Sequence, residues 1–302
     1  MTFAHLRRPG ALALLGVGAC ALIWGTTWYA ITWQLGVVDP IASVTWRFGL
    51  AAVVLFGALW VMRRPVALTR AQHLASVGQG AFVFAISYAF TYAAEGRVTS
   101  AIVAVVFAAL AFLNLVMFRL IEGQRAAREA WLGAGLGLVG VAVLSGGELL
   151  GARLGPGAIV GIGFATLAVL SSTIGNWFSW RNQTAGAAVM PATAWAMAYG
   201  TGMLALYGLA TGVQFRIDPS PGYLVSLAYL SVVGSVAAFV IYFSVARSRG
   251  YALASYISAL TPPIAMLVSV MFEGARFGWT ALVGLALVLA GQVMLSRAPR
   301  DA

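Results

Sequence analysis

Long apolar stretches follow one another along this chain and are separated by short segments that carry arginine, glycine and proline. Most stretches are about 20 residues long, the length of α-helix that crosses the roughly 30 Å apolar core of a bilayer. The pattern predicts ten membrane-spanning helices near residues 11–33, 40–62, 72–94, 98–120, 130–146, 156–181, 191–213, 220–246, 251–272 and 278–296. The chain is therefore expected to be an all-α integral membrane protein with the lipid bilayer as its solvent.

The composition agrees with a membrane protein. Of the 302 residues, 61% are hydrophobic and 9% are charged, and the mean hydropathy is +0.92. A water-soluble domain of this size would expose far more apolar surface than soluble monomers tolerate. Ten spans would use about 200 residues and leave about 100 for loops and tails, so no soluble domain is expected.

The distribution of arginines indicates how the chain is oriented. All 18 basic residues are arginine and the net charge is +10, which in a soluble protein would suggest a nucleic-acid partner. If the N-terminus is cytoplasmic, thirteen arginines fall on the cytoplasmic side, and only four fall outside: Arg97, Arg153, Arg216 and Arg276. Because short cytoplasmic loops are enriched in arginine, both termini are expected in the cytoplasm, and no nucleic-acid partner is expected.

A shift of the chain by 151 positions reveals an internal repeat. The shift places Pro40 on Pro191 and Glu122-Gly123 on Glu273-Gly274, and it also aligns Gly49 with Gly200, Gly133 with Gly284, Gly140 with Gly291, Tyr88 with Phe239 and Tyr92 with Phe243. Paired prolines and Glu-Gly pairs are rare in lipid-embedded segments, so the repeat indicates an ancient duplication. Each half holds five predicted helices, an odd number, so the second half is expected to enter the membrane upside down.

The repeat predicts both the organisation of the chain and its class of function. We expect a cytoplasmic tail at 1–10, a five-helix repeat at 11–146, a connecting loop at 147–155, a second five-helix repeat at 156–296 and a tail at 297–302. Two similar halves of opposite orientation can exchange conformations and open a shared central site to each side in turn. This favours a carrier of a small organic solute. The alternative is a duplication retained only for packing.

Several short motifs within this pattern resemble a known family. They are Trp24-Gly25, Arg47-Phe48, the Leu-x-Pro formed by Leu260 and Pro262, and Glu273-Gly274. The pattern resembles the EamA family of the drug/metabolite transporter superfamily over about residues 10–296. The resemblance implies a ten-helix carrier of a bacterial-type plasma (inner) membrane that exports amino acids or similar small metabolites without a cofactor. Within that family, the aromatic-rich chain looks most like the YddG-type exporters of aromatic amino acids.

Aromatic residues are the first candidates for a solute-binding cavity. Trp24, Tyr88, Trp177 and Tyr256 lie deep in predicted spans, where they can line a cavity suited to a flat apolar ring. Tyr92 is also a candidate because it shares a helix face with Tyr88. Its place near the end of a span favours the aromatic belt at the membrane surface.

Polar side chains inside predicted spans are the second group of candidates, because they are costly in a bilayer unless they face a cavity or a partner. Arg47 can bind a substrate carboxylate or hold neighbouring helix ends through backbone carbonyls, and the family pattern favours the structural or gating role. Asn114, Asn176 and Ser255 can hydrogen-bond a zwitterion. They can equally bond between helices.

The sequence Thr261, Pro262 and Pro263 predicts a hinge or kink in the ninth span. Prolines in mid-span leave carbonyl groups of the preceding turn without donors. The equivalent segment of the first half, residues 107–113, lacks the proline pair. The two halves are therefore not expected to contribute equally to the site.

The positions of the acidic residues bear on the coupling of transport. All eight fall in predicted loops, span ends or tails. A proton-coupled carrier normally keeps an ionisable group inside the membrane, so facilitative transport is expected. Glu95 and Glu122 lie near span ends, and they leave a proton-coupled drug or metabolite exporter as the alternative.

Two other classes of protein are disfavoured. An intramembrane enzyme would need a nucleophile with a base or a metal cluster; the sequence presents neither, so no catalytic or metal-binding residue is predicted. A channel would need a ring of charge or a carbonyl filter. The expected partner is a small-molecule solute such as an amino acid. A monomer is expected, and the small-residue pairs Gly133 with Gly137 and Gly157 with Gly161 leave a dimer as the alternative.

Overall fold

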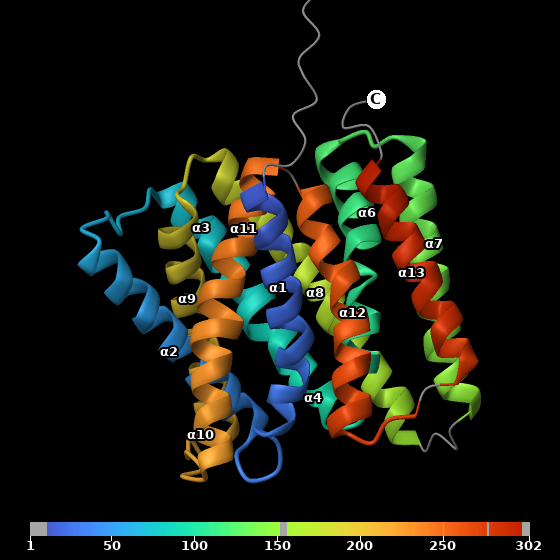
Figure 1. Cartoon of the computed structure of the whole chain (residues 1–302). Coiled ribbons are helices and arrows are strands. Elements are labelled where there is room, and N and C mark those ends of the chain that lie inside the picture. The colour runs from blue at the N-terminus through green and yellow to red at the C-terminus, as the bar shows by residue number, and fades with distance from the viewer. Residues whose placement is uncertain (1–10, 152–155, 250, 277, 298–302) are drawn as a thin grey trace, which may run out of the picture.

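The computed structural model describes residues 11–151, 156–249, 251–276 and 278–297, and every regular element within them is helical (Figure 1). In chain order the elements are α1 (Ala11–Thr32), α2 (Pro40–Val61), α3 (Arg70–Gln79), η1 (Gly80–Ser87), α4 (Tyr88–Glu95), α5 (Ser100–Phe107), α6 (Leu110–Glu122), α7 (Arg128–Gly151), α8 (Pro156–Thr184), α9 (Val189–Thr211), α10 (Pro221–Ala228), η2 (Tyr229–Ala237), α11 (Ala238–Arg249), α12 (Tyr251–Phe272) and α13 (Trp279–Arg297). The two η elements are π-helices. Helix α7 extends into the segment that was expected to connect the halves.

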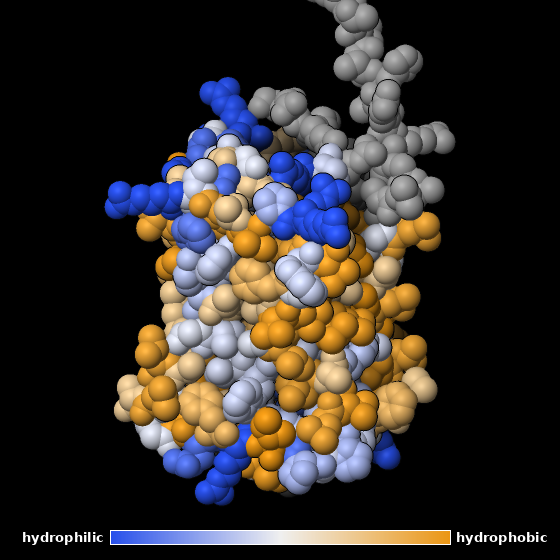
Figure 2. All heavy atoms as spheres, turned by 90° about the vertical axis from the view of Figure 1, so that its left-hand side faces the viewer, coloured by the Kyte–Doolittle hydropathy of each residue, from blue (hydrophilic) through white to orange (hydrophobic). Residues whose placement is uncertain are grey.

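Several helical stretches have the length and composition of membrane spans. Six stretches are long and apolar enough: Leu15–Thr32, Pro40–Val61, Arg70–Glu95, Ser100–Glu122, Gly157–Thr184 and Pro221–Ser248. Two shorter apolar helices, Leu260–Phe272 and Trp279–Gly291, add to them. Figure 2 shows hydrophilic residues gathered at the two ends of the molecule and a mostly apolar middle. An all-helical membrane protein is thereby confirmed, whereas the count of ten crossings stays a prediction.

The repeated Glu-Gly pair ends a helix in the same way in both halves. Gly123 and Gly274 both have positive φ angles, of 65° and 67°. The same backbone hydrogen bond closes each end, from Gln124 to Phe118 at 3.2 Å and from Ala275 to Ser269 at 3.1 Å. This closure requires a left-handed residue after the helix, which glycine adopts without a steric penalty.

The crossing of α7 and α13 relates the two halves geometrically. A Cβ atom built on Gly140 would lie 2.6 Å from the carbonyl oxygen of Gly284, and one built on Gly291 would overlap the carbonyl group of Gly133. Gly140 is the repeat equivalent of Gly291, and Gly133 that of Gly284. The contact between α7 and α13 is thus reciprocal, and the two helices run antiparallel. A two-fold axis between the halves produces this arrangement. The face formed by Gly133 and Gly137, for which a dimer was the alternative, packs on α13 of the same chain.

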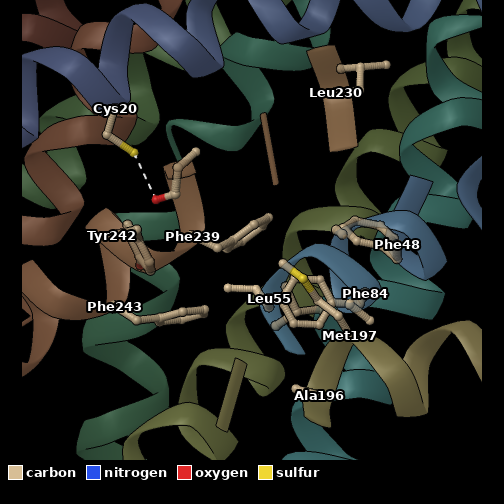
Figure 3. Close-up of a cluster of buried hydrophobic side chains, with 14 of the residues drawn as sticks. Cys20, Phe48, Leu55, Phe84, Ala196, Met197, Leu230, Phe239, Tyr242 and Phe243 are labelled. Carbon is tan, nitrogen blue, oxygen red and sulfur yellow. Dashed lines mark hydrogen bonds between the residues drawn. The ribbon is translucent and has the colours of Figure 1, made fainter. Parts of the chain in front are cut away.

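The main buried cluster lies where α1, α2, η1, α9 and α11 meet (Figure 3). The rings of Phe48 and Phe84 are 5.0 Å apart, and those of Phe84 and Phe239 are 4.9 Å apart. The thiol of Cys20 donates to the carbonyl oxygen of Ala238 at 3.5 Å. This cluster therefore joins residues of both halves.

The two π-helices occupy equivalent places in the repeat. A shift of 151 positions moves η1 onto residues 231–238, which overlap η2 almost completely. π-helical turns interrupt the regular backbone ladder and are frequent at functional sites.

Helix α1 begins and α13 ends at the same end of the molecule (Figure 1).

Candidate functional site

A cavity lies between the two halves of the chain. The volume open to the centres of water molecules is about 70 Å³, several times what a single water molecule needs. Three pairs of residues that line it are equivalent in the repeat: Tyr88 with Phe239, Phe107 with Ser258, and Leu110 with Thr261. The cavity is therefore built by corresponding positions of both halves.

Aromatic side chains form much of the cavity wall. Trp24 of α1 packs against Phe239 and Tyr242 of α11, with ring centroids 5.2 Å apart in both pairs. Its indole N–H donates to the carbonyl oxygen of Gly234 in η2 at 3.3 Å, which fixes the ring. On another part of the wall Trp28 packs on Phe107 at 5.0 Å. Such walls suit a flat apolar ring.

Arg47 of α2 lines the same cavity and is 1% exposed. Its Nε atom donates to the hydroxyl of Ser235 at 3.0 Å. The guanidinium carbon lies 4.6 Å from the ring centroid of Tyr88 and 5.3 Å from that of Phe48. Its Nη1 atom is buried and has no hydrogen-bond partner within the described part of the chain. The positive charge is thus surrounded by aromatic rings and by hydroxyl groups, that of Ser235 and those of Tyr88 and Tyr92.

A pair of asparagines provides polar groups from another side. Asn176 of α8 lines the cavity and donates to the Asn114 side-chain oxygen at 3.4 Å and to the Tyr242 hydroxyl at 3.3 Å. Asn114 lies behind it and is not among the lining residues. The hydroxyls of Ser172 and Ser258 also line the cavity.

Two aromatic candidates lie outside the cavity lining. Tyr92 is fully buried, and its hydroxyl donates at 2.7 Å to Gln34 in the turn after α1. The prediction that it joins the surface belt is wrong, because Tyr92 belongs to the main buried cluster. Trp177 donates to a carboxylate oxygen of Glu122 at 2.6 Å and packs on Phe178 at 4.8 Å. Both residues therefore make contacts between helices.

The candidates on α12 are only partly described. Thr261 lines the cavity and donates to the carbonyl oxygen of Ile257 at 2.9 Å. The side chains of Ser255 and Tyr256 lie outside the described residues. Pro262 and Pro263 lie inside a helix that continues to Phe272, so the predicted hinge stays a prediction. The interruption between α5 and α6 falls at Ala108 and Ala109, in the half that lacks the proline pair.

Several lining residues were missed from the sequence. Thr27 follows Trp24 by one helical turn, and Tyr242 follows Phe239 by one turn. The rule that residues three positions apart share a helix face would have found Thr27 from the candidate Trp24. Tyr242 could be reached in the same way only from Phe239, the repeat equivalent of Tyr88. Phe107 was missed as well, although the repeat aligns it with Ser258, which also lines the cavity.

The acidic residue Glu95 is more buried than its place at the end of α4 suggested. It is 6% exposed, and its Oε1 atom has no hydrogen-bond partner among the described residues. The Ser100 hydroxyl lies 3.0 Å from Glu95 Oε2 and 2.8 Å from Glu273 Oε1. One hydroxyl hydrogen serves one carboxylate at a time, so the second contact is a hydrogen bond only when a carboxyl group carries a proton. Neither Glu95 nor Glu122 lines the cavity.

Comparison with known proteins gives a consistent result over both halves. The model of the EamA-like transporter family matches residues 11–146 and again 159–297. YedA of Escherichia coli (strain K12), described as an uncharacterized inner membrane transporter, is 27% identical and covers 93% of this chain and 92% of its own length. A protein of Salmonella typhimurium, described as a probable amino-acid metabolite efflux pump, is 25% identical, with coverages of 94% and 93%. PecM of Dickeya dadantii is 24% identical, with coverages of 90% and 88%.

One solved crystal structure has the same fold. It superposes with a TM-score of 0.71 at 20% sequence identity, over 94% of this chain and 96% of that chain. At this identity the likeness concerns the fold alone. The helical arrangement around the cavity is therefore shared with a protein of very different sequence.

Proposed function

The chain belongs to the EamA-like transporter family, and from this premise we propose that it exports neutral amino acids, aromatic ones included, by facilitative alternating access through the central cavity. It is an inner-membrane transporter and not an enzyme. The proposal includes ten crossings as two inverted five-helix repeats, cytoplasmic termini and a monomer that needs no cofactor. The resemblance to YddG-type exporters is part of the same proposal.

The observation that carries the proposal is the cavity lined by equivalent residues of the two halves. If the halves enter the membrane in opposite orientations, exchange of their conformations opens such a cavity to opposite sides. Val83 of η1 lines the cavity, and Gly234 and Ser235 of η2 bond to lining residues. The two π-helices are therefore the places where we expect the backbone to change.

The chemistry of the walls supports an amino-acid solute. Trp24, Tyr88 and Phe239 offer aromatic surface, while Asn176 and Thr261 offer hydrogen-bonding groups. A zwitterion with an apolar side chain needs both kinds of surface. The Salmonella relative is described as a probable amino-acid metabolite efflux pump, which supports the same class of solute.

Counterflow in proteoliposomes tests the proposal. Vesicles that contain the purified chain are loaded with unlabelled phenylalanine, tryptophan, threonine or methionine, and entry of the labelled solute is followed with and without a pH gradient. We expect saturable exchange that does not depend on the gradient. Absence of exchange with all four solutes would contradict the amino-acid assignment, and linear, unsaturable flux would contradict the carrier mechanism in favour of a channel.

A proton-coupled exporter is the second candidate, and the burial of Glu95 favours it. The Ser100 hydroxyl lies within hydrogen-bond distance of both Glu95 and Glu273, so a proton shared by these carboxyl groups would lie between the two halves. Proton coupling would make net transport, measured without solute on the far side, depend on the imposed gradient. Uptake into vesicles without internal solute, measured with and without the pH gradient, therefore separates the two candidates.

A further inference from the structure

We infer that the guanidinium group of Arg47 binds a carboxylate of the transported solute, so that the cavity selects solutes that join a carboxylate to an apolar or aromatic body. The inference rests on the proposed function, because it assigns one residue of the same cavity. It replaces the structural or gating role that the sequence favoured for Arg47.

The first support is a buried charge without a counter-charge. Arg47 is 1% exposed, and among the described residues no aspartate or glutamate forms an ion pair with it. Burial of a charge without a partner is costly, because the lost hydration is not replaced. A carboxylate that entered the cavity would supply the missing partner.

The second support is that the structural alternative lacks its contacts. That alternative required Arg47 to bond backbone carbonyls at neighbouring helix ends. In the described part of the chain the polar contacts of Arg47 run to side-chain hydroxyls, those of Ser235, Tyr88 and Tyr92, and no backbone carbonyl accepts from it. The Nη1 atom is left buried and unpaired in the wall of the cavity.

The third support is the fixed geometry of the group. The bond to Ser235 and the rings of Tyr88 and Phe48 hold the guanidinium plane before any solute arrives. A planar guanidinium matches the two oxygens of a carboxylate better than a point charge does. Little side-chain freedom is then lost on binding, which favours affinity.

The remaining walls suit the rest of such a solute and disfavour a cation. Trp24, Tyr88 and Phe239 provide aromatic surface close to Arg47. No acidic side chain is among the residues that line the described cavity. A cationic drug would therefore meet the charge of Arg47 without a carboxylate to balance its own.

The test compares two ligands that differ only in the carboxylate. Binding of 3-phenylpropionate and of its neutral amide to the full chain in detergent micelles is measured by isothermal titration calorimetry. We expect the wild-type chain to bind the acid at least tenfold more tightly than the amide. In Arg47→Gln the affinity for the acid should fall about 10- to 100-fold, the loss typical of a charge-assisted hydrogen bond, while the affinity for the amide should be unchanged.

Arg97→Gln is the matched control. Arg97 also stacks on an aromatic ring, at 5.0 Å from the centroid of Phe164, but it is exposed and does not line the cavity. This variant should keep the wild-type preference for the acid. Retained binding of the amide by Arg47→Gln reports that the variant is folded, and Arg47→Lys, which keeps the charge, should recover part of the preference.

The outcomes test the carboxylate-binding role of Arg47 independently of the proposed export of amino acids. Equal affinity of the wild-type chain for acid and amide would overturn that role without any variant, as would an Arg47→Gln chain that still prefers the acid. Competition by inorganic phosphate as strong as that by the acid would overturn the carboxylate assignment in favour of a general anion site. If amino-acid counterflow fails but the preference for the acid depends on Arg47, the proposed function is wrong and the role of Arg47 stands.

Discussion

At the crossing of α7 and α13, the position of a single added methyl group decides whether a glycine-to-alanine substitution stabilises or destabilises the folded chain. In Gly140→Ala the new Cβ atom would lie 2.6 Å from the Gly284 carbonyl oxygen and 2.7 Å from the Val288 amide nitrogen. Ordinary contacts begin near 3.4 Å, so the two helices must separate by nearly 1 Å. Overpacking of this kind costs about 1–3 kcal/mol, which exceeds the gain of about 0.5–1 kcal/mol from replacing a helical glycine by alanine.

Gly135→Ala is the control on the same helix, because a Cβ atom there has nothing within 4 Å. We expect it to raise the free energy of unfolding by about 0.5–1 kcal/mol, whereas Gly140→Ala should lower it by about 0.5–2 kcal/mol. Chemical unfolding in detergent micelles, followed by circular dichroism, measures both. If Gly140→Ala is as stable as Gly135→Ala, the helices do not approach as closely as described.

The reciprocal contact sharpens the same test. Gly291→Ala should destabilise the chain in the same way, because its Cβ atom would overlap the Gly133 carbonyl on the other side of the crossing. Once one methyl group has separated the helices, the second costs less, so the double variant should lose less than the sum of the single losses. Strict additivity would show that the two glycines act at independent contacts.

Three further predictions concern the cavity and its surroundings. Tyr88→Ala should weaken counterflow of tryptophan about 2- to 10-fold more than that of threonine, since one aromatic contact contributes about 0.5–1.5 kcal/mol. Trp177→Ala is the control and should leave the ratio of tryptophan to threonine counterflow unchanged. Equal losses for both solutes in Tyr88→Ala would indicate a folding defect. Tyr92→Phe should lower stability by about 1 kcal/mol in thermal unfolding, because it removes the hydrogen bond to Gln34, and a shift in solute preference would place it in the binding site. Glu95→Gln should leave exchange and its independence of the pH gradient unchanged, whereas a gradient response that only the wild type shows would establish proton coupling.

The membrane class and the repeat could be predicted from the amino-acid sequence alone, because both depend on local or additive properties. Apolar runs of sufficient length predict spans wherever they occur. Each Glu-Gly pair ends a helix with a left-handed glycine, and this motif takes only two adjacent residues. Gly123 and Gly274 could therefore be aligned without any knowledge of the fold. Trp24, Tyr88 and Asn176 were also found from the sequence as residues that line the cavity, because depth within a span narrows the choice.

The face of each helix that meets the cavity could not be predicted from the sequence and follows from how the helices pack. Tyr88 lines it whereas Tyr92, one turn further, donates to Gln34; Asn176 lines it whereas Trp177, the next residue, reaches Glu122. In a soluble protein the polar face of a helix shows which side points to water and which side to the interior. Lipid is as apolar as a helix interface, so the hydrophobic periodicity of these helices says little about which face points to the protein interior. The bond of Arg47 to Ser235 and the contact of Ser100 with Glu273 likewise join residues more than 150 positions apart in the chain, which come together only when the two halves pack.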